Sequence, residues 1–291
     1  MAQISYLEKF YAQQGEGLYT GAASVFLRTF GCNLRCRGFG RNVIPIDEKH
    51  NPEVLKIIKN IDEYDTLEDL PLVKTGCDSY AAVYPEFKRF ANKADPEQLA
   101  HELLALTGQK QWGDIHLVIT GGEPLLGWQR VYPQLLDACV KQGLKYVTFE
   151  TNGTQTLTDS FRQYIAATAS TIEYTFSVSP KLPASGERLD AAIKTDAIES
   201  YLGAAHNIYF KFVVSEASDV ADAKDVLTFY KHKSDAMVQA LDAVPVYLMP
   251  LGGLEAEYNS NFKTIAQLAL DNGMRFSPRL HLSISGNVWG S

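Results

Sequence analysis

Two cysteines stand close together near the start of the chain, in the segment Gly-Cys-Asn-Leu-Arg-Cys that contains Cys32 and Cys36. Three residues separate them, so both thiols can point into one loop and bind a shared metal. The basic neighbours Arg35 and Arg37 favour the thiolate, which is the form that ligates metals. The alternative is a pair of buried thiols, since free cysteine is common in protein cores.

The other two cysteines, Cys77 and Cys139, lie far away in the sequence. Structural zinc usually takes four ligands in two close pairs, so zinc is the weaker metal alternative for a chain with one close pair. Cys139 falls in the middle of a predicted helix, and we expect it to face the core. Cysteines of a cytosolic protein are poor disulfide candidates, which leaves metal binding or catalysis as the expectation for the rest.

Three further polar segments each follow a predicted strand. They are residues 119–124 (ITGGEP), 150–154 (ETNGT) and 179–181 (SPK). Each segment alone is compatible with an ordinary turn, because Gly-Gly, Asn-Gly and Ser-Pro are common turn dipeptides. However, ligand sites of α/β folds gather at the carboxyl ends of the strands. Their shared position therefore predicts one ligand site at that edge of a sheet.

Other candidate groups lie near the two ends of the chain. Residues 14–17 (QGEG) form a glycine-rich segment that could be no more than a turn. Arg28 stands in the middle of a strand, where an unpaired charge is costly to bury. Its planar guanidinium suits a carboxylate, and a structural salt bridge is the alternative. Arg279 and His281 lie in an alternating, strand-like stretch, and we assign neither a role.

A regular alternation of strands and helices must position these groups. Strands are predicted at residues 23–30, 114–120, 145–150, 173–179, 208–214 and 244–249, and helices at residues 96–109, 128–142, 159–167, 219–230 and 261–272. Such alternation implies right-handed βαβ units and a parallel sheet. Residues 38–75 interrupt it with one helix, for which Asn51 is the cap and Pro52 the first turn. We predict a single α/β domain over residues 1–291, an open or partial barrel with an insertion at about 38–75.

The bulk composition limits the remaining function classes. The 291 residues carry a formal net charge of −7, which argues against a nucleic-acid or anionic-membrane surface. No apolar run reaches the roughly 20 residues that cross a bilayer, and the N-terminus lacks the pattern of a signal peptide. We expect a cytoplasmic protein with no direct nucleic-acid or membrane partner.

The N-terminal stretch, residues 10–36, resembles the start of the 7-carboxy-7-deazaguanine synthase family, a branch of the radical S-adenosylmethionine (SAM) superfamily. That family carries a QGEG segment and a CxxxCxxC motif followed by Asp-Thr. The position of its third cysteine is Phe39 here, and phenylalanine cannot ligate iron. Residues 76–80 (GCDSY) resemble the family's Trp-Cys-Asp-Thr-x-Tyr segment, so Cys77 is expected to be the third ligand, displaced by an inserted loop. Loop insertions cost little, because closure entropy grows only slowly with length.

The resemblance implies a partial (β/α)6 radical SAM barrel and a set of site residues. A [4Fe–4S] cluster would be held by Cys32, Cys36 and Cys77, with its fourth iron open to SAM. SAM contacts would come from Gly76, Asp78, Gly121, Gly122, Glu123, Asn152, Ser179, Pro180 and Lys181. Substrate contacts would come from Gln13, Gln14, Gly15, Glu16, Arg28 and Thr120. Ser79 stands where the family has a Mg²⁺-binding threonine, and its hydroxyl can ligate such an ion.

The resemblance also implies the reaction. A 5′-deoxyadenosyl radical would abstract hydrogen from C6 of 6-carboxy-5,6,7,8-tetrahydropterin, and ring contraction with loss of ammonia would give 7-carboxy-7-deazaguanine. An electron donor such as flavodoxin and a homodimeric state are implied as well. Two alternatives stay open: a different radical SAM reaction, and a degenerate, non-catalytic protein that binds SAM or a pterin.

Overall fold

The computed structural model describes residues 3–41, 49–286 and 288–290. Its centre is a nine-stranded sheet in the order β3-β1-β2-β4-β5-β6-β7-β8-β9. The strands are β1 (Ile4–Gln13), β2 (Ala23–Thr29), β3 (Asn92–Ala94), β4 (His116–Gly121), β5 (Tyr146–Thr151), β6 (Glu173–Val178), β7 (Asn207–Val214), β8 (Val246–Pro250) and β9 (Arg275–Phe276). The run from β2 to β9 is parallel, whereas β1 pairs antiparallel with both β2 and β3.

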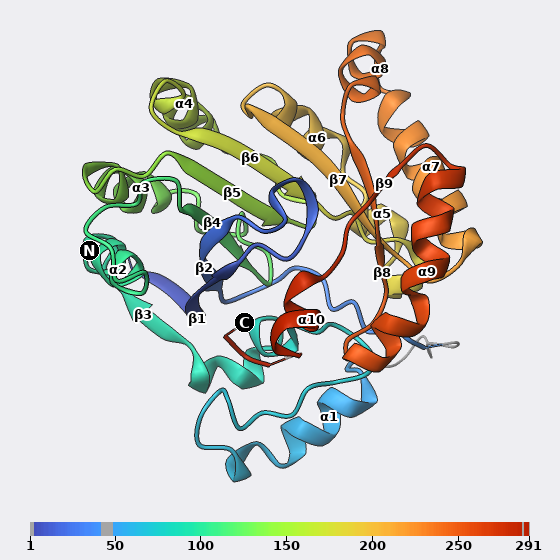
Figure 1. The fold of residues 1–291 in the computed structure, drawn as a ribbon, viewed down its shortest axis with the longest axis horizontal. Coiled ribbons are helices and arrows are strands. Elements are labelled where there is room, and N and C mark those ends of the chain that lie inside the picture. Colours follow the sequence, from blue (N-terminus) through green and yellow to red (C-terminus); the bar gives the residue numbers. More distant parts are fainter. Residues whose placement is uncertain (1–2, 42–48, 287, 291) are drawn as a thin grey trace.

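Helices cover the outside of this curved sheet (Figure 1). They are α2 (Pro96–Ala105), α3 (Tyr132–Lys141), α4 (Asp159–Thr168), α5 (Leu189–Ala192), α6 (Thr195–Leu202), α7 (Ala217–Lys231), α8 (Asp235–Asp242) and α9 (Glu255–Asp271). Of the seven parallel strands in the described residues, all but β9, namely β2 and β4 to β8, are those predicted from the sequence. The predicted α/β fold, a partial six-stranded barrel, is confirmed.

The main core lies between the sheet and these helices. It contains the apolar side chains of the parallel strands, such as Leu117, Phe149 and Phe176, all fully buried. Cys139 on α3 is part of this core, as predicted. The strands are continuously apolar because both of their faces are covered, which is usual in parallel sheets. No helix in the described ranges is long and apolar enough to cross a membrane.

Several elements differ from the prediction. Helix α3 begins at Tyr132 rather than at residue 128, because Pro133 lacks the N–H that an earlier start would need. Helix α9 begins six residues earlier than predicted, with Glu255 and Glu257 in a first turn that favours acidic side chains. The prediction did not include β1, β3 or β9.

The predicted strand-like stretch around Arg279 and His281 is wrong. It forms the helix α10 (Leu280–Ser285), in which Leu282 is the buried side chain. The alternating leucines imitate a strand, but the segment has left the sheet after Phe276. Instead of pairing with a strand, the backbone N–H of Leu280 donates to the carbonyl of Gly15, 3.0 Å away.

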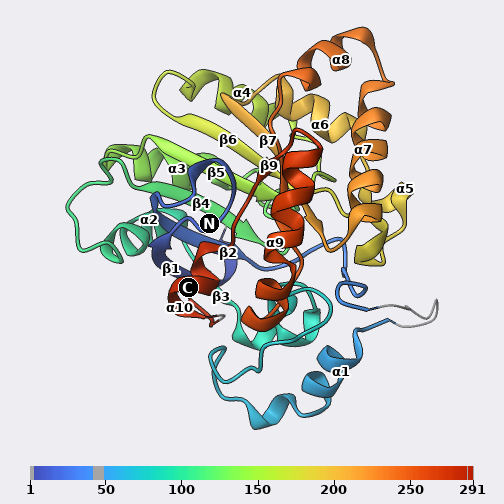
Figure 2. The ribbon, with the colours of Figure 1, turned by 45° about the vertical axis from the view of Figure 1, so that its right-hand side comes forward.

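The predicted insertion carries its own small core. Its helix α1 (Pro52–Lys59) is capped by Asn51, whose side chain accepts hydrogen bonds from the backbone N–H groups of Glu53 and Val54, as predicted. Figure 2 shows α1 projecting below the barrel. The second apolar cluster joins the insertion to the following segment and to β1; it comprises Leu7, Val54, Ile57, Leu67, Leu70, Val73, Tyr80, Ala81, Ala82, Val83, Tyr84 and Phe87.

Candidate active site

A cavity opens at the carboxyl ends of the parallel strands. Most residues singled out from the sequence line it: Gln13, Gln14, Gly15, Glu16, Arg28, Cys32, Cys36, Gly76, Cys77, Asp78, Ser79, Thr120, Gly121, Gly122, Asn152, Ser179 and Lys181. Two predicted contacts, Glu123 and Pro180, are not part of its wall. The strand ends therefore bring together segments that lie as far apart in the sequence as residues 13 and 181.

Three free cysteines share one end of this cavity. Burial raises the pKa of Cys32 to about 11 and that of Cys77 to about 12, and it raises the pKa of Cys36 well above the ordinary value. The three thiols are close enough for Cys36 to interact electrostatically with the other two, and the ammonium of Lys181 counteracts the rise at each of them. Buried thiols of this kind become thiolates when a metal replaces their protons.

The surroundings of Cys32 fit a ligating sulfur. Its Sγ lies 3.4 Å from the backbone N–H of Leu34 and 3.8 Å from Nδ2 of Asn152, and both are donors. Such hydrogen bonds stabilise cluster-bound sulfur. Among the described residues, no three or more His, Cys, Asp or Glu side chains are grouped closely enough for a single metal ion.

The insertion is closed at its base by a short hydrogen bond. The N–H of Gly76 donates to the carbonyl of Phe39 over 2.7 Å, and Asn51 donates from Nδ2 to Oγ1 of Thr75 over 3.0 Å. These contacts bring the two ends of the loop together, so Cys77 follows Phe39 closely in space. A cysteine about forty residues after Cys36 in sequence therefore lines the same cavity as Cys32 and Cys36.

The Gly-Gly turn after β4 packs directly on the loop that contains Cys32. A Cβ atom on Gly122 would lie 2.3 Å from the carbonyl oxygen of Gly31 and 2.8 Å from Cβ of Cys32. A Cβ on Gly121, which has a φ of +137°, would lie 2.2 Å from the carbonyl oxygen of Thr29. Both glycines are required here by close backbone approach.

Glu123 does not line the cavity but lies behind its wall and stabilises it. Its fully buried carboxylate accepts hydrogen bonds from Oγ1 of Thr151 and the N–H of Asn152, both at 2.7 Å, and from the N–H of Leu125 at 3.0 Å. Burial raises the pKa of Glu123, while these donors favour its ionised form. The carboxylate therefore fixes the turn that presents Asn152 to the cavity.

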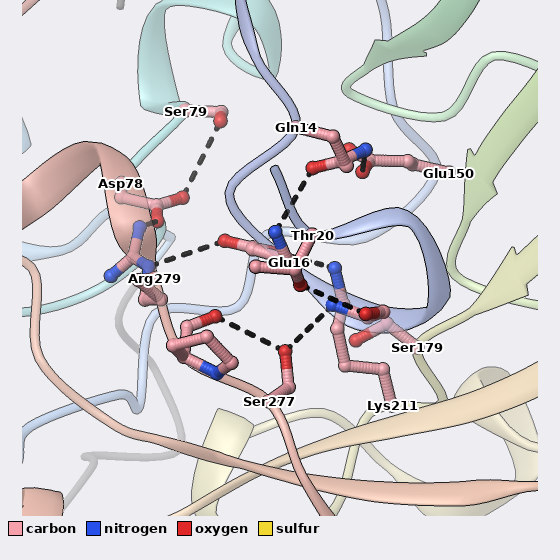
Figure 3. Close-up of polar contacts among 12 residues, drawn as sticks. Gln14, Glu16, Thr20, Asp78, Ser79, Glu150, Ser179, Lys211, Ser277 and Arg279 are labelled. Carbon is pink, nitrogen blue, oxygen red and sulfur yellow. Dashed lines mark hydrogen bonds and ion pairs between the residues drawn. The ribbon is translucent and has the colours of Figure 1, made fainter. Parts of the chain in front are cut away.

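The opposite end of the cavity is built on ion pairs (Figure 3). Glu16 pairs with Lys211 of β7 and with Nε of Arg279 at 3.3 Å. Burial alone would raise the pKa of Glu16, but these two cations outweigh it and lower the pKa to about 2. Gln14 is also fixed: its Nε2 donates to Glu150 at 3.1 Å, and its Oε1 accepts from the N–H of Glu16 at 3.1 Å.

Arg28 has both a structural partner and a place in the cavity wall. Its Nε lies 2.6 Å from Oε1 of Glu8, which faces it from the neighbouring strand β1. Its Nη1 donates to Oγ of Ser79 at 2.9 Å. The salt bridge considered from the sequence therefore exists, and the guanidinium still lines the cavity. The same contact places a cation beside the hydroxyl that was expected to bind Mg²⁺.

Sequence reasoning missed several charged members of the site. Lys211 lies in the middle of an apolar strand, IYFKFVV, where the argument applied to Arg28 would have found it. Glu8 lies on β1, which was not predicted and which brings it to Arg28. Arg279 and His281 were noticed but given no role, and both line the cavity.

Comparisons with known proteins agree with this geometry. No family model matches the chain. A protein of Halobacterium salinarum named 7-carboxy-7-deazaguanine synthase is 30% identical over 291 residues, covering 95% of this chain and 88% of the relative. A protein of the same name from Pyrobaculum aerophilum is 27% identical, with 99% and 97% covered. The crystal structure of QueE from Escherichia coli shares the fold, with a TM-score of 0.53, 21% identity, and 96% and 95% of the two chains covered.

The first of these relatives is similar over 95% of this chain and 88% of its own length, a range that spans most of the residues that build the cavity. The resemblance stated from the sequence is thereby confirmed: this chain belongs to the 7-carboxy-7-deazaguanine synthase family.

Proposed function

We propose that the protein converts 6-carboxy-5,6,7,8-tetrahydropterin to 7-carboxy-7-deazaguanine with release of ammonia. Membership of the 7-carboxy-7-deazaguanine synthase family gives the reaction class. The observation that carries the proposal for this chain is that Cys32, Cys36 and Cys77 share one cavity with the QGEG loop, despite the insertion. A site for radical chemistry and a polar site for a small substrate are thus continuous.

Cys32, Cys36 and Cys77 would hold a [4Fe–4S] cluster. When bound, the cluster and SAM supply radical chemistry that begins with reductive cleavage of a carbon–sulfur bond. The chain contributes by burying the three thiols and by directing N–H donors to Cys32. The nearby Lys181 adds a positive charge that favours thiolates at all three positions.

SAM would lie against the strand ends that follow β4, β5 and β6. Gly121 and Gly122 offer exposed backbone where a side chain could not fit, and Asn152 offers an amide that Glu123 and Thr154 hold in place. Lys181 also lines the cavity, and its Nζ lies 3.0 Å from both oxygens of Ser179. These groups suit the amino acid and hydroxyl groups of SAM. Gly76, Asp78 and Pro180 stay predictions of the resemblance.

The substrate would lie at the end formed by Gln13, Gln14, Gly15, Thr120 and Arg28. Arg28 is the group suited to the pterin carboxylate, because a guanidinium binds a carboxylate through parallel hydrogen bonds. Its bond to Ser79 is to a neutral hydroxyl, which a carboxylate can replace.

Glu16 keeps its negative charge at neutral pH, since its pKa is about 2. It therefore holds the loop through its two cations and does not exchange protons with the substrate. This makes Glu16 a fixed acceptor in the cavity wall rather than a general acid.

Mg²⁺ at Ser79 was the expectation from the resemblance, and the residues as placed do not fit it. The hydroxyl oxygen accepts from Arg28 at 2.9 Å, and the neighbouring carboxylate of Asp78 is bound to Arg279 at 2.7 Å. As long as no carboxylate occupies Arg28, a divalent cation would have to displace a guanidinium from Ser79, so no step is assigned to it. The electron donor, the homodimer and the cytoplasmic location also stay predictions.

Anaerobic reconstitution with iron and sulfide tests the proposal. We expect about four irons per chain, and 7-carboxy-7-deazaguanine detectable by mass spectrometry after reduction with SAM and the carboxytetrahydropterin. Cys77→Ala should lose the cluster, whereas the matched control Cys139→Ala, in the core of the barrel, should keep it. SAM cleavage without this product would point to another radical SAM substrate, and a chain without iron would point to a non-catalytic binding protein.

A further inference from the structure

The segment from the end of β9 into the start of α10 contributes Arg279 and His281 to the cavity wall and contacts the QGEG loop at two points. Oγ of Ser277 accepts from the N–H of Gly17 at 2.9 Å, and the N–H of Leu280 donates to the carbonyl of Gly15 at 3.0 Å. A Cβ on Gly15 would lie 2.4 Å from Nδ1 of His281, so the two segments are in close contact. We call residues 277–281 the C-terminal strap.

The strap delivers Arg279, whose guanidinium joins three separate loops. Its Nε bonds Glu16 of the QGEG loop at 3.3 Å, and its Nη2 bonds Asp78, next to Cys77, at 2.7 Å. Its Nη1 donates to the carbonyl of Gly252 in the loop after β8. Figure 3 shows Arg279 between Asp78 and Glu16. The side chain of Arg279 is 8% exposed and that of Glu16 is 15% exposed, whereas that of Asp78 is 44% exposed, so the bond to Glu16 is the one that forms away from bulk water.

All three nitrogens of this guanidinium are therefore used by the protein itself. Arg279 lines the cavity, but three of its five N–H donors, one on each nitrogen, are held by these protein acceptors. It therefore acts mainly through Glu16 and Asp78, two carboxylates that one buried cation holds close together. Without that cation the like charges of Glu16 and Asp78 would face each other and repel.

We propose that Arg279 is a positioning residue that couples the substrate loop, residues 13–17, to the segment containing Cys77. This proposal rests on the proposed function, because it concerns the binding of the carboxytetrahydropterin between those two segments. A lysine cannot replace Arg279, since one ammonium nitrogen cannot reach three acceptors in the planar arrangement that a guanidinium provides.

The test uses reconstituted, anaerobic holoenzyme in four forms: wild type, Arg279→Ala, Arg279→Lys and the control Arg275→Ala. Arg275 lies in the same part of the chain but bonds Tyr247 outside the cavity wall. We expect both changes at Arg279 to raise the KM for the carboxytetrahydropterin at least about 30-fold, the usual effect of breaking a buried charge pair. Iron content should stay at the wild-type level, and so should the KM of Arg275→Ala.

Two further measurements separate positioning from a general structural role. Added guanidinium should lower the KM of Arg279→Ala, whereas methylammonium should not. Hydrogen exchange should quicken at residues 14–17 and 78–80 of Arg279→Ala and stay unchanged in β5. The exchange measurement does not depend on activity, so it tests the coupling even if the wild type forms no deazaguanine product, an outcome that would refute the proposed function instead. An unchanged KM in either Arg279 variant, unchanged exchange in both loops, or loss of iron from both variants would overturn the proposal.

Discussion

Replacing Gly122 by alanine is the sharpest structural test of the turn that supports the cluster loop. The added Cβ would lie 2.3 Å from the carbonyl oxygen of Gly31 and 2.8 Å from Cβ of Cys32. Ordinary contacts of this kind begin at 3.4 Å, so the two loops would have to separate by about 1 Å. The opposing atoms are backbone and a Cβ, which cannot rotate away. The strain therefore falls on the loop that carries Cys32.

Overpacking of a buried site costs about 1–3 kcal/mol, which corresponds to a fall in Tm of about 2–10 °C for a chain of this size. A displaced Cys32 should also bind its metal less well, since ligand position is sensitive to such shifts. We expect Gly122→Ala to lower both the Tm of the reconstituted protein and the iron that it keeps after gel filtration.

The measurement is circular dichroism melting together with iron and sulfide analysis. Gly203→Ala is the matched control, because its Cβ would meet nothing closer than 3.8 Å and its φ is −78°. That change should leave Tm and iron content as they are, or raise Tm slightly. If Gly122→Ala keeps full iron and melts within about 1 °C of the wild type, the close approach of the two loops is wrong.

Three other predictions concern the polar groups of the site and its insertion. Glu16→Gln should lower the free energy of unfolding by about 3 kcal/mol, because it leaves the buried cations Lys211 and Arg279 without their shared carboxylate. Since the pKa of Glu16 is lowered from 4.5 to about 2, its stabilising effect is complete above pH 4.5 and is lost as the pH falls toward 2; acid titrations of the wild type and Glu16→Gln should converge there. Asn51→Ala should lower the free energy of unfolding by about 1–2 kcal/mol through loss of the helix cap, measured by denaturant unfolding; an unchanged midpoint would contradict this. Arg28→Lys should raise the KM for the pterin substrate roughly tenfold with folding intact, and equal KM values would exclude carboxylate binding by the guanidinium.

The parallel part of the fold could be predicted because each strand is a short apolar run followed by a turn and an amphipathic helix. The antiparallel strand β1 could not, since its burial pattern is interrupted by a register shift between Tyr6 and Glu8. Missing β1 also hid Glu8, which faces Arg28 across the sheet. The sequence therefore could not show that Arg28 has an ion-pair partner.

The candidate site, too, could be predicted where it depends on local sequence motifs and could not be predicted where it depends on contacts between distant residues. Motifs at strand ends predicted the cavity wall, because parallel strands end at one edge of the sheet. Glu123 was expected to contact SAM, yet its carboxylate is turned into the fold by donors at residues 151 and 152. Arg279 bonds a residue 263 positions earlier, and only the folded chain brings it to the cavity wall.

The hydrogen bond between Phe39 and Gly76 at the base of the insertion links two equilibria that are usually separate, the folding of a loop and the binding of iron. Two of the three expected iron ligands precede the insertion and one follows it, so opening the base of this loop would move Cys77 away from the other two. Folding of residues 49–75 and retention of iron would then favour each other, since a ligand that binds only the closed form also stabilises it. An appendage outside the barrel can in this way govern how long the enzyme keeps its metal.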